Sequence, residues 1–92
     1  MSFKHETDRI YLENENGDVV AEVTFPVLND EVVNINHTFV DPSLRGQGVA
    51  SKLMLEVAKK LRQENKKAMI SCSYAVQWFD KNKEYKDVVY MP

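Results

Sequence analysis

Residues 40–61, VDPSLRGQGVASKLMLEVAKKL, place Gly46 and Gly48 directly before a long segment with helical periodicity. Its apolar residues recur every three or four positions, which predicts an amphipathic helix over residues 48–65; they are Leu53, Met54, Val57, Ala58 and Leu61. Amides in the first turn of a helix have no intrahelical partner, and glycine lets such backbone approach a ligand closely. The stretch therefore predicts an anion site: a nest of amides over residues 45–50, with the charge of Arg45 at its edge.

The segments around this loop read as short strands and a second helix. Residues 8–13, 19–25 and 31–40 alternate apolar and polar positions, and Asn16-Gly17 supplies a hairpin turn between the first two. The apolar run 68–72 follows a helix, so we expect a strand parallel to the third one. Ser73 is the expected cap of a second helix over residues 74–82, and residues 87–90 suit a last short strand. The order predicts a layered α+β fold.

Length and composition restrict the class of protein. Ninety-two residues with 43% hydrophobic content fit one domain over residues 1–92, and we take a monomer as the default. A net charge of -2 argues against a nucleic-acid partner. The single cysteine, Cys72, excludes an intramolecular disulfide and suits a reducing compartment. Without a signal peptide or a long apolar run, we expect a cytoplasmic protein that does not enter a membrane.

The loop also carries a family pattern. Arg45, Gly48 and Ala50 satisfy Arg/Gln-x-x-Gly-x-Gly/Ala, and Val-Asp-Pro at residues 40–42 leads into it. This resembles the acyl-CoA signature of the GNAT superfamily of N-acetyltransferases, and the likeness covers residues 18–83. It implies that acetyl-CoA is a substrate, with its pantetheine arm along Thr38, Phe39 and Val40. The diphosphate would lie on Arg45, Gly46, Gln47, Gly48, Val49 and Ala50, with the Ser51 hydroxyl either at the anion or in solvent.

The second family region departs from the pattern. In this region GNAT enzymes have a pattern similar to Asn-x-x-Ala-x-x-Phe-Tyr, whereas residues 72–79 of this chain are CSYAVQWF. Phe79 thus replaces the tyrosine that usually protonates the departing thiolate, and Trp78 and Phe79 are better core residues than pocket residues. Tyr74 is the nearest substitute acid, with Tyr85 and Tyr90 further along the chain.

Cys72 stands where the family has asparagine. At a helix N-terminus a thiol ionises more readily and is able to accept an acetyl group covalently. A packed, inert cysteine is the competing interpretation.

His37 is the expected base. It shares a predicted face with Val33, Ile35 and Phe39, so it is either a structural core histidine or a general base for an ammonium acceptor, paired with Cys72 if the two approach. A minimal GNAT-like subfamily that the chain resembles has a histidine and a cysteine at these two positions. The chain lacks the two helices between the first strands that form much of the usual acceptor pocket.

Three functions remain open from the sequence. The first is transfer of acetyl from acetyl-CoA to an unidentified amine of a small molecule, peptide or protein. The second is a non-catalytic acyl-CoA-binding or sensing module, since the acid and the acceptor helices are missing. The third is a partner-binding domain in which the glycine loop is only a turn.

Overall fold

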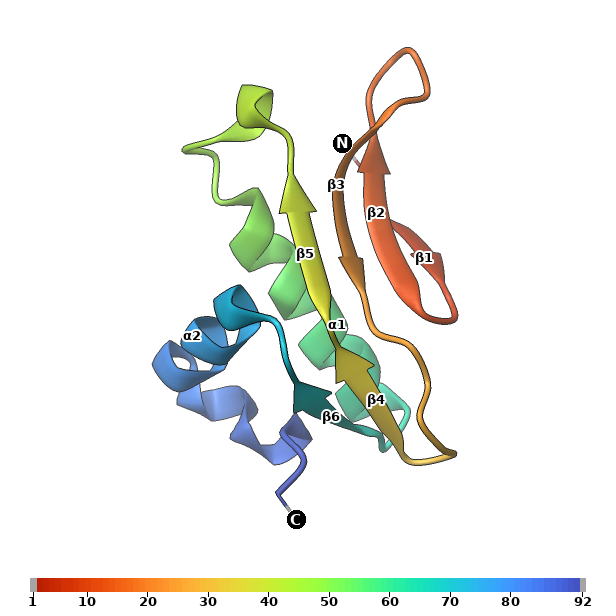
Figure 1. Cartoon of the computed structure of the whole chain (residues 1–92), viewed down its shortest axis with the longest axis vertical. Helices are drawn as coiled ribbons and strands as arrows, with labels where there is room; N and C mark the ends of the chain where they lie inside the picture. Colours follow the sequence, from red (N-terminus) through yellow and green to blue (C-terminus); the bar gives the residue numbers. More distant parts are fainter. Residues whose placement is uncertain (1, 92) are drawn as a thin grey trace.

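The computed structural model describes residues 2–91 and has a mixed α+β architecture, as the sequence predicts. Strands come first along the chain, and helices dominate its second half (Figure 1). The elements are β1 (Lys4–Glu6), β2 (Arg9–Glu13), β3 (Val19–Thr24), β4 (Val32–Ile35), β5 (His37–Val40), α1 (Val49–Gln63), β6 (Lys67–Ile70) and α2 (Ser73–Lys81). Short 3₁₀ helices occupy Pro42–Leu44 and Lys83–Val88. None of the helices within residues 2–91 is long and apolar enough to cross a membrane.

The strands form two small sheets that meet at Asn36. Four antiparallel strands lie in the order β1-β2-β3-β5, and β4 pairs with β6 in parallel. Because Asn36 alone separates β4 from β5, one segment passes from the parallel pair into the antiparallel sheet (Figure 1). The expected continuous strand over residues 31–40 is therefore wrong. Its expected parallel pairing is confirmed for β4 but not for β5.

Hydrogen bonds explain the break. The Asn36 amide donates to the Thr24 carbonyl (3.3 Å), and its Oδ1 accepts from Thr24 Oγ1 (2.6 Å), so this residue is held against β3. The amides of Ser71 and Cys72 both donate to the Ile35 carbonyl (3.0 and 3.2 Å), where pairing with β6 ends. Beyond this point β5 and the chain after β6 diverge.

The break also reverses the expected faces of β5. Ile35 is buried, but Asn36 and His37 are both exposed, so the alternation shifts by one residue. Phe39 keeps 38% of its surface exposed, whereas Thr38 and Val40 are half-buried. The predicted shared face of Val33, Ile35, His37 and Phe39 is therefore wrong, because the alternation does not run through Asn36.

A second shift occurs in β3. Leu12 pairs with Ala21 and Glu13 with Val19, so Val20 is an extra residue in a β-bulge. Consequently Val20 is buried and Val19 is exposed, whereas an unbroken alternation through residues 19–25 puts Val19 on the face of Ala21 and Val23 and Val20 on the other.

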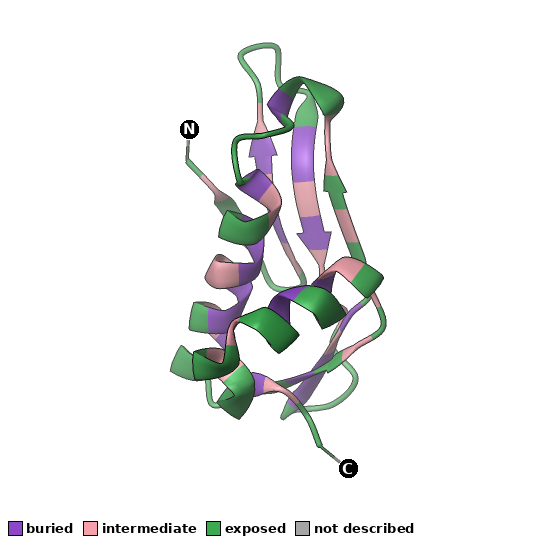
Figure 2. Cartoon of the chain, turned by 90° about the vertical axis from the view of Figure 1, so that its left-hand side faces the viewer, coloured by how far each residue is buried: buried purple, intermediate pink, exposed green. Residues whose placement is uncertain are grey.

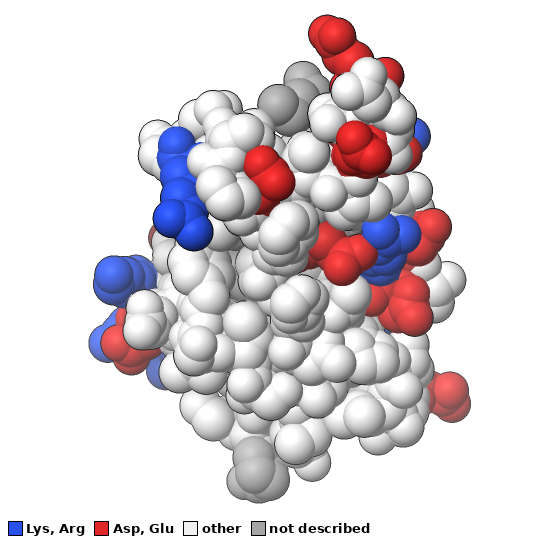
Figure 3. All heavy atoms as spheres, turned by 45° about the horizontal axis from the view of Figure 1, so that its top comes forward, with Lys and Arg blue, Asp and Glu red and all other residues white. Residues whose placement is uncertain are grey.

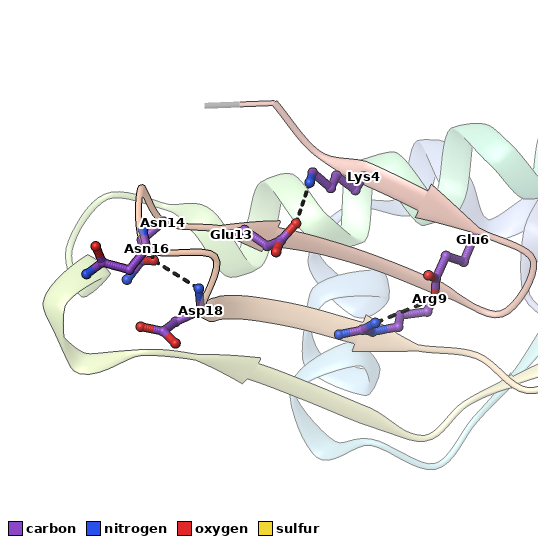
Figure 4. Close-up of polar contacts among 7 residues, drawn as sticks. All are labelled: Lys4, Glu6, Arg9, Glu13, Asn14, Asn16 and Asp18. Carbon is purple, nitrogen blue, oxygen red and sulfur yellow. Dashed lines mark hydrogen bonds and ion pairs between the residues drawn. The ribbon is translucent and has the colours of Figure 1, made fainter.

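The predicted Asn16-Gly17 turn is confirmed and joins β2 to β3 (Figure 4). Asn14 Oδ1 accepts from the amides of Asn16 (2.9 Å) and Asp18 (3.0 Å), and Gly17 has φ +83°. A side-chain oxygen that organises its own turn in this way is typical of asparagine.

The sequence did not predict β1. All of its residues are exposed, so no apolar alternation marks it. An ion pair between Lys4 and Glu13 and another between Arg9 and Glu6 (3.5 Å) link it to β2 (Figure 4).

Helix α1 supplies the core from one side of the antiparallel sheet (Figure 2). Its predicted apolar stripe is confirmed, since none of the five residues exposes more than 1% of its surface. Burying each large aliphatic side chain contributes about 1.5–3 kcal/mol. The stripe therefore fixes the helix, and with it the loop, against the sheet.

The C-terminal part departs from the prediction. Cys72, not Ser73, is the N-cap of α2, and Trp78 and Phe79 are buried as expected. Residues 87–90 do not form a strand: a 3₁₀ helix runs to Val88, and a single parallel bridge joins Val89 to Ala68.

Candidate functional site

The glycine loop leaves a row of amides without partners. Gly46 (φ +82°) and Gly48 (φ +70°) adopt left-handed backbone, and Gly48 is the N-cap of α1 without a side chain to cap it. Within residues 2–91, five amides at and before the start of α1 donate to no acceptor. They belong to Gly46, Gly48, Val49, Ala50 and Ser51. We call this set the amide row. Its donors and the positive end of the helix dipole suit an anion.

The amide row differs from the expected nest over residues 45–50, because two of those amides are bonded within the protein and the row extends to Ser51. The Arg45 amide donates to the Pro42 carbonyl (3.2 Å) and the Gln47 amide to the Leu44 carbonyl (3.3 Å), so neither is free. The side chain of Gln47 lines a separate cavity with Phe3. Gln47 therefore makes no visible contribution to the anion site.

The amide row opens into a shallow cavity of about 250 Å³. Its lining combines the loop, the first turn of α1, Val40 from β5 and Tyr74 from α2. Arg45 also lines it and is exposed, which places one positive charge at its edge, as predicted. Figure 3 shows charged side chains mainly around the margin of this end of the molecule, with a broad uncharged area between them. Attraction for an anion therefore depends on the amides and on Arg45.

Strand β5 presents an open edge beside this cavity. It is the last strand of its sheet, and alternate residues of an antiparallel strand direct their backbone groups to the partner. The Asp41 amide points to β3, since it donates to the Val20 carbonyl (2.7 Å). Phe39 lies two residues before Asp41 and pairs with Glu22, so its backbone groups point to β3 as well. The backbone groups of Thr38 and Val40 therefore face the open edge, while those of Phe39 are used by β3.

Cys72 lies across the gap from this edge. Its Sγ is 3.5 Å from Thr38 Oγ1, and this contact joins the two diverging chain segments. The thiol is half-buried, and at the N-cap of α2 it faces the positive end of a second helix dipole.

The pKa of Cys72 is lowered by these neighbours. Burial raises it, but the Thr38 hydroxyl lowers it, and so do nearby amides of Ala75, Tyr74 and Thr38. The lowering effects exceed the effect of burial, so the pKa lies below that of an ordinary cysteine. A larger thiolate fraction near neutral pH makes the sulfur a better nucleophile.

Replacing Thr38 by valine should raise the pKa of Cys72, because the hydroxyl that stabilises the thiolate is removed. The pH profile of iodoacetamide alkylation should then move to higher pH, with slower alkylation at neutral pH. Thr7→Val is the matched control, since Thr7 is exposed in the turn between β1 and β2. An unchanged profile in Thr38→Val would show that the hydroxyl does not stabilise the thiolate.

The structure does not bring His37 to Cys72. Consecutive strand side chains point to opposite faces, and it is Thr38 that contacts the thiol. His37 is exposed on the other face, and no hydrogen bond or ion pair of its side chain is present within residues 2–91. The expected pairing of thiol and imidazole is therefore not formed.

The tyrosines occupy different surroundings. Tyr74 lines the cavity, whereas Tyr90 lines cavities at the C-terminal segment and Tyr85 packs 5.9 Å from Trp78. Ser51 Oγ accepts from Trp78 Nε1 (2.8 Å), so its oxygen is bonded within the protein.

Sequence reasoning missed two contacts of the site, that of Thr38 with Cys72 and that of Trp78 with Ser51. The second left a signal, because a buried indole N–H needs an acceptor and Ser51 begins the helix against which α2 packs. The first left none, because it crosses between segments 34 residues apart.

The fold is thus of the α+β class, and one segment of it passes between two sheets beside the amide row and the N-cap residue Cys72. A family model described as GCN5-related N-acetyl-transferase matches residues 9–88, and the chain belongs to this family.

Solved structures agree with this assignment. A GCN5-like N-acetyltransferase from Staphylococcus aureus is 34% identical, with a TM-score of 0.79 over 99% of this chain and 89% of that chain. A Mycobacterium tuberculosis protein in complex with CoA is 18% identical, with a TM-score of 0.63 over 83% of this chain and 47% of that one. The N-acetylglutamate synthase from Neisseria gonorrhoeae, complexed with coenzyme A and N-acetyl-glutamate, is 15% identical, with a TM-score of 0.63. The chain covers 83% of its own length in that match but 18% of the synthase. No curated protein matches the chain.

Proposed function

We propose that the protein is an acetyl-CoA-dependent N-acetyltransferase that acts on an amine acceptor. The observation that carries this function is the amide row, which opens into one cavity with the open edge of β5. A diphosphate needs clustered donors, and a pantetheine arm needs unpaired strand groups; both lie side by side here.

Acetyl-CoA would lie across these features in one direction. The diphosphate would accept from the amide row with Arg45 beside it, and the pantetheine arm would pair with Thr38 and Val40. The arm would then lead toward Cys72, because Thr38 contacts that thiol. Two solved structures of this fold were determined in complex with CoA, which supports CoA as the ligand.

Cys72 is the proposed nucleophile. Its thiolate attacks the carbonyl carbon of the thioester, the bond to the CoA sulfur breaks, and CoA leaves as a thiolate. A neutral amine then attacks the acetyl-cysteine, the Cys72 thiolate leaves, and the nitrogen loses a proton. The lowered pKa of Cys72 favours the first step.

His37 is proposed to act on the acceptor rather than on the thiol. It lies on the exposed face of β5, one residue from the strand position that contacts Cys72. Because its side chain points away from Thr38 and Cys72, the imidazole would take the proton of the attacking amine through water rather than by direct contact.

The function is tested by following release of the CoA thiol from acetyl-CoA with a panel of small amines and peptides. We expect release that depends on the amine and produces its acetamide. If the protein binds CoA but no amine increases release above background, it is the non-catalytic binding module suggested by the buried Phe79 at the usual acid position.

A further inference from the structure

We propose that Tyr74 is a ligand of the CoA diphosphate, held in place by Ser51 and Trp78, rather than the acid that protonates the departing thiolate. This inference rests on the proposed function and deepens it. It implies selection for acyl thioesters that carry a nucleotide diphosphate.

The position of Tyr74 is the first support. It comes from α2, yet it lines the same cavity as the glycine loop and the first turn of α1. Tyr74 is therefore the one residue of α2 among those that line this cavity within residues 2–91. A diphosphate over the amide row would lie within the space that Tyr74 borders.

The neighbours of Tyr74 give the second support. Ser51 Oγ accepts the indole N–H of Trp78 at 2.8 Å, and Trp78 is 6% exposed, so a core residue fixes this oxygen. A serine hydroxyl has one proton to donate. Ser51 and Tyr74 line the same cavity, so a bond from the Ser51 hydroxyl to the Tyr74 oxygen would leave the phenol proton for a ligand there.

The protonation state of Tyr74 suits an anion. Burial raises the pKa of Tyr74 above its ordinary value, and the Ser51 hydroxyl opposes this only in part. At neutral pH the phenol is therefore a neutral donor. It adds a hydrogen bond to the diphosphate without adding a negative charge.

The same geometry argues against an acid at the thiolate. Tyr74 follows Cys72 by two residues at the start of α2, and helix residues two apart do not share a face. The thiol contacts Thr38 in β5, whereas Tyr74 lines the cavity of the amide row together with Ser51 of α1. Tyr74 is thus directed toward the phosphate end of the site.

The test measures binding of three probes to the wild type and to Tyr74→Phe by calorimetry. The probes are CoA, its nucleotide half, which carries the diphosphate, and pantetheine, which does not. Tyr74→Phe removes a hydrogen bond to a charged group, so its affinity for CoA and for the nucleotide half should fall by about ten- to a hundredfold. Pantetheine should bind as it does to the wild type.

Two further variants sharpen the result. Tyr90→Phe is the matched control, because Tyr90 lines other cavities, and it should bind all three probes normally. Ser51→Ala should weaken binding of the nucleotide half less than Tyr74→Phe does. It should add little in the double variant, since Ser51 is proposed to act by orienting the Tyr74 hydroxyl.

The outcomes separate this inference from the proposed function. If the wild type binds no CoA, the proposed function fails. If the wild type binds CoA and Tyr74→Phe binds the nucleotide half equally well, or loses pantetheine instead, the assignment of Tyr74 is wrong and the function stands.

Discussion

Replacing Cys72 by serine is expected to abolish acetylation of the protein and to slow acetyl transfer by at least about a thousandfold. The serine hydroxyl keeps the approximate volume of the thiol and is able to bond to Thr38, but it does not ionise near neutral pH. The wild type incubated with acetyl-CoA should gain one acetyl group that hydroxylamine removes. Because the chain has one cysteine, the site of a thioester is unambiguous.

A measurement of CoA binding shows whether Cys72→Ser has lost the chemical step or the fold. Cys72→Ser should bind CoA with nearly wild-type affinity, because the amide row and Arg45 are unchanged. If Cys72→Ser transfers acetyl at the wild-type rate, the covalent route is wrong and the amine attacks acetyl-CoA directly.

Replacing Gly48 by alanine is expected to weaken CoA binding by about tenfold or more, since hydrogen bonds to a charged group are lost. Gly48 has φ +70°, a conformation that costs an L-residue about 1–2 kcal/mol. Relief of that strain would rotate the N-cap and misalign the amides of Gly48 and Val49. No protein atom lies within 4 Å of the added Cβ, so the effect arises from backbone conformation and from the space left for the ligand.

Gly17→Ala is the matched control for this variant. Gly17 has φ +83°, and its added Cβ would make ordinary contact with Glu13, 3.8 Å away, in a hairpin turn that does not line the cavity of the amide row. Both variants should lose similar stability in urea, but only Gly48→Ala should lose affinity. Equal CoA affinity in the two variants would show that the conformation of Gly48 does not matter for binding.

The parts of the fold that local sequence determines could be predicted. The apolar stripe of α1 and the Asn16-Gly17 turn depend on neighbours within a few residues, and both are confirmed. The amide row also follows from local order, because glycines before a helix leave its first amides uncapped.

The split at Asn36 could not be predicted in the same way. Alternation continues in the sequence through Ile35, His37 and Phe39, but pairing with two different sheets decides which side chains are buried. The faces of β5 therefore depend on contacts with Thr24 and Cys72, which are distant in the chain. For the same reason the expected meeting of His37 and Cys72 is replaced by that of Thr38 and Cys72.

An NMR titration of the ¹⁵N-labelled protein with CoA tests the central claim, that the amide row holds the diphosphate. The largest changes are expected at the amides of Gly46, Gly48, Val49, Ala50 and Ser51. The amides of Arg45 and Gln47, which are bonded to Pro42 and Leu44, should shift less although both residues adjoin the row. Saturating CoA that leaves the five amides unshifted would contradict the account.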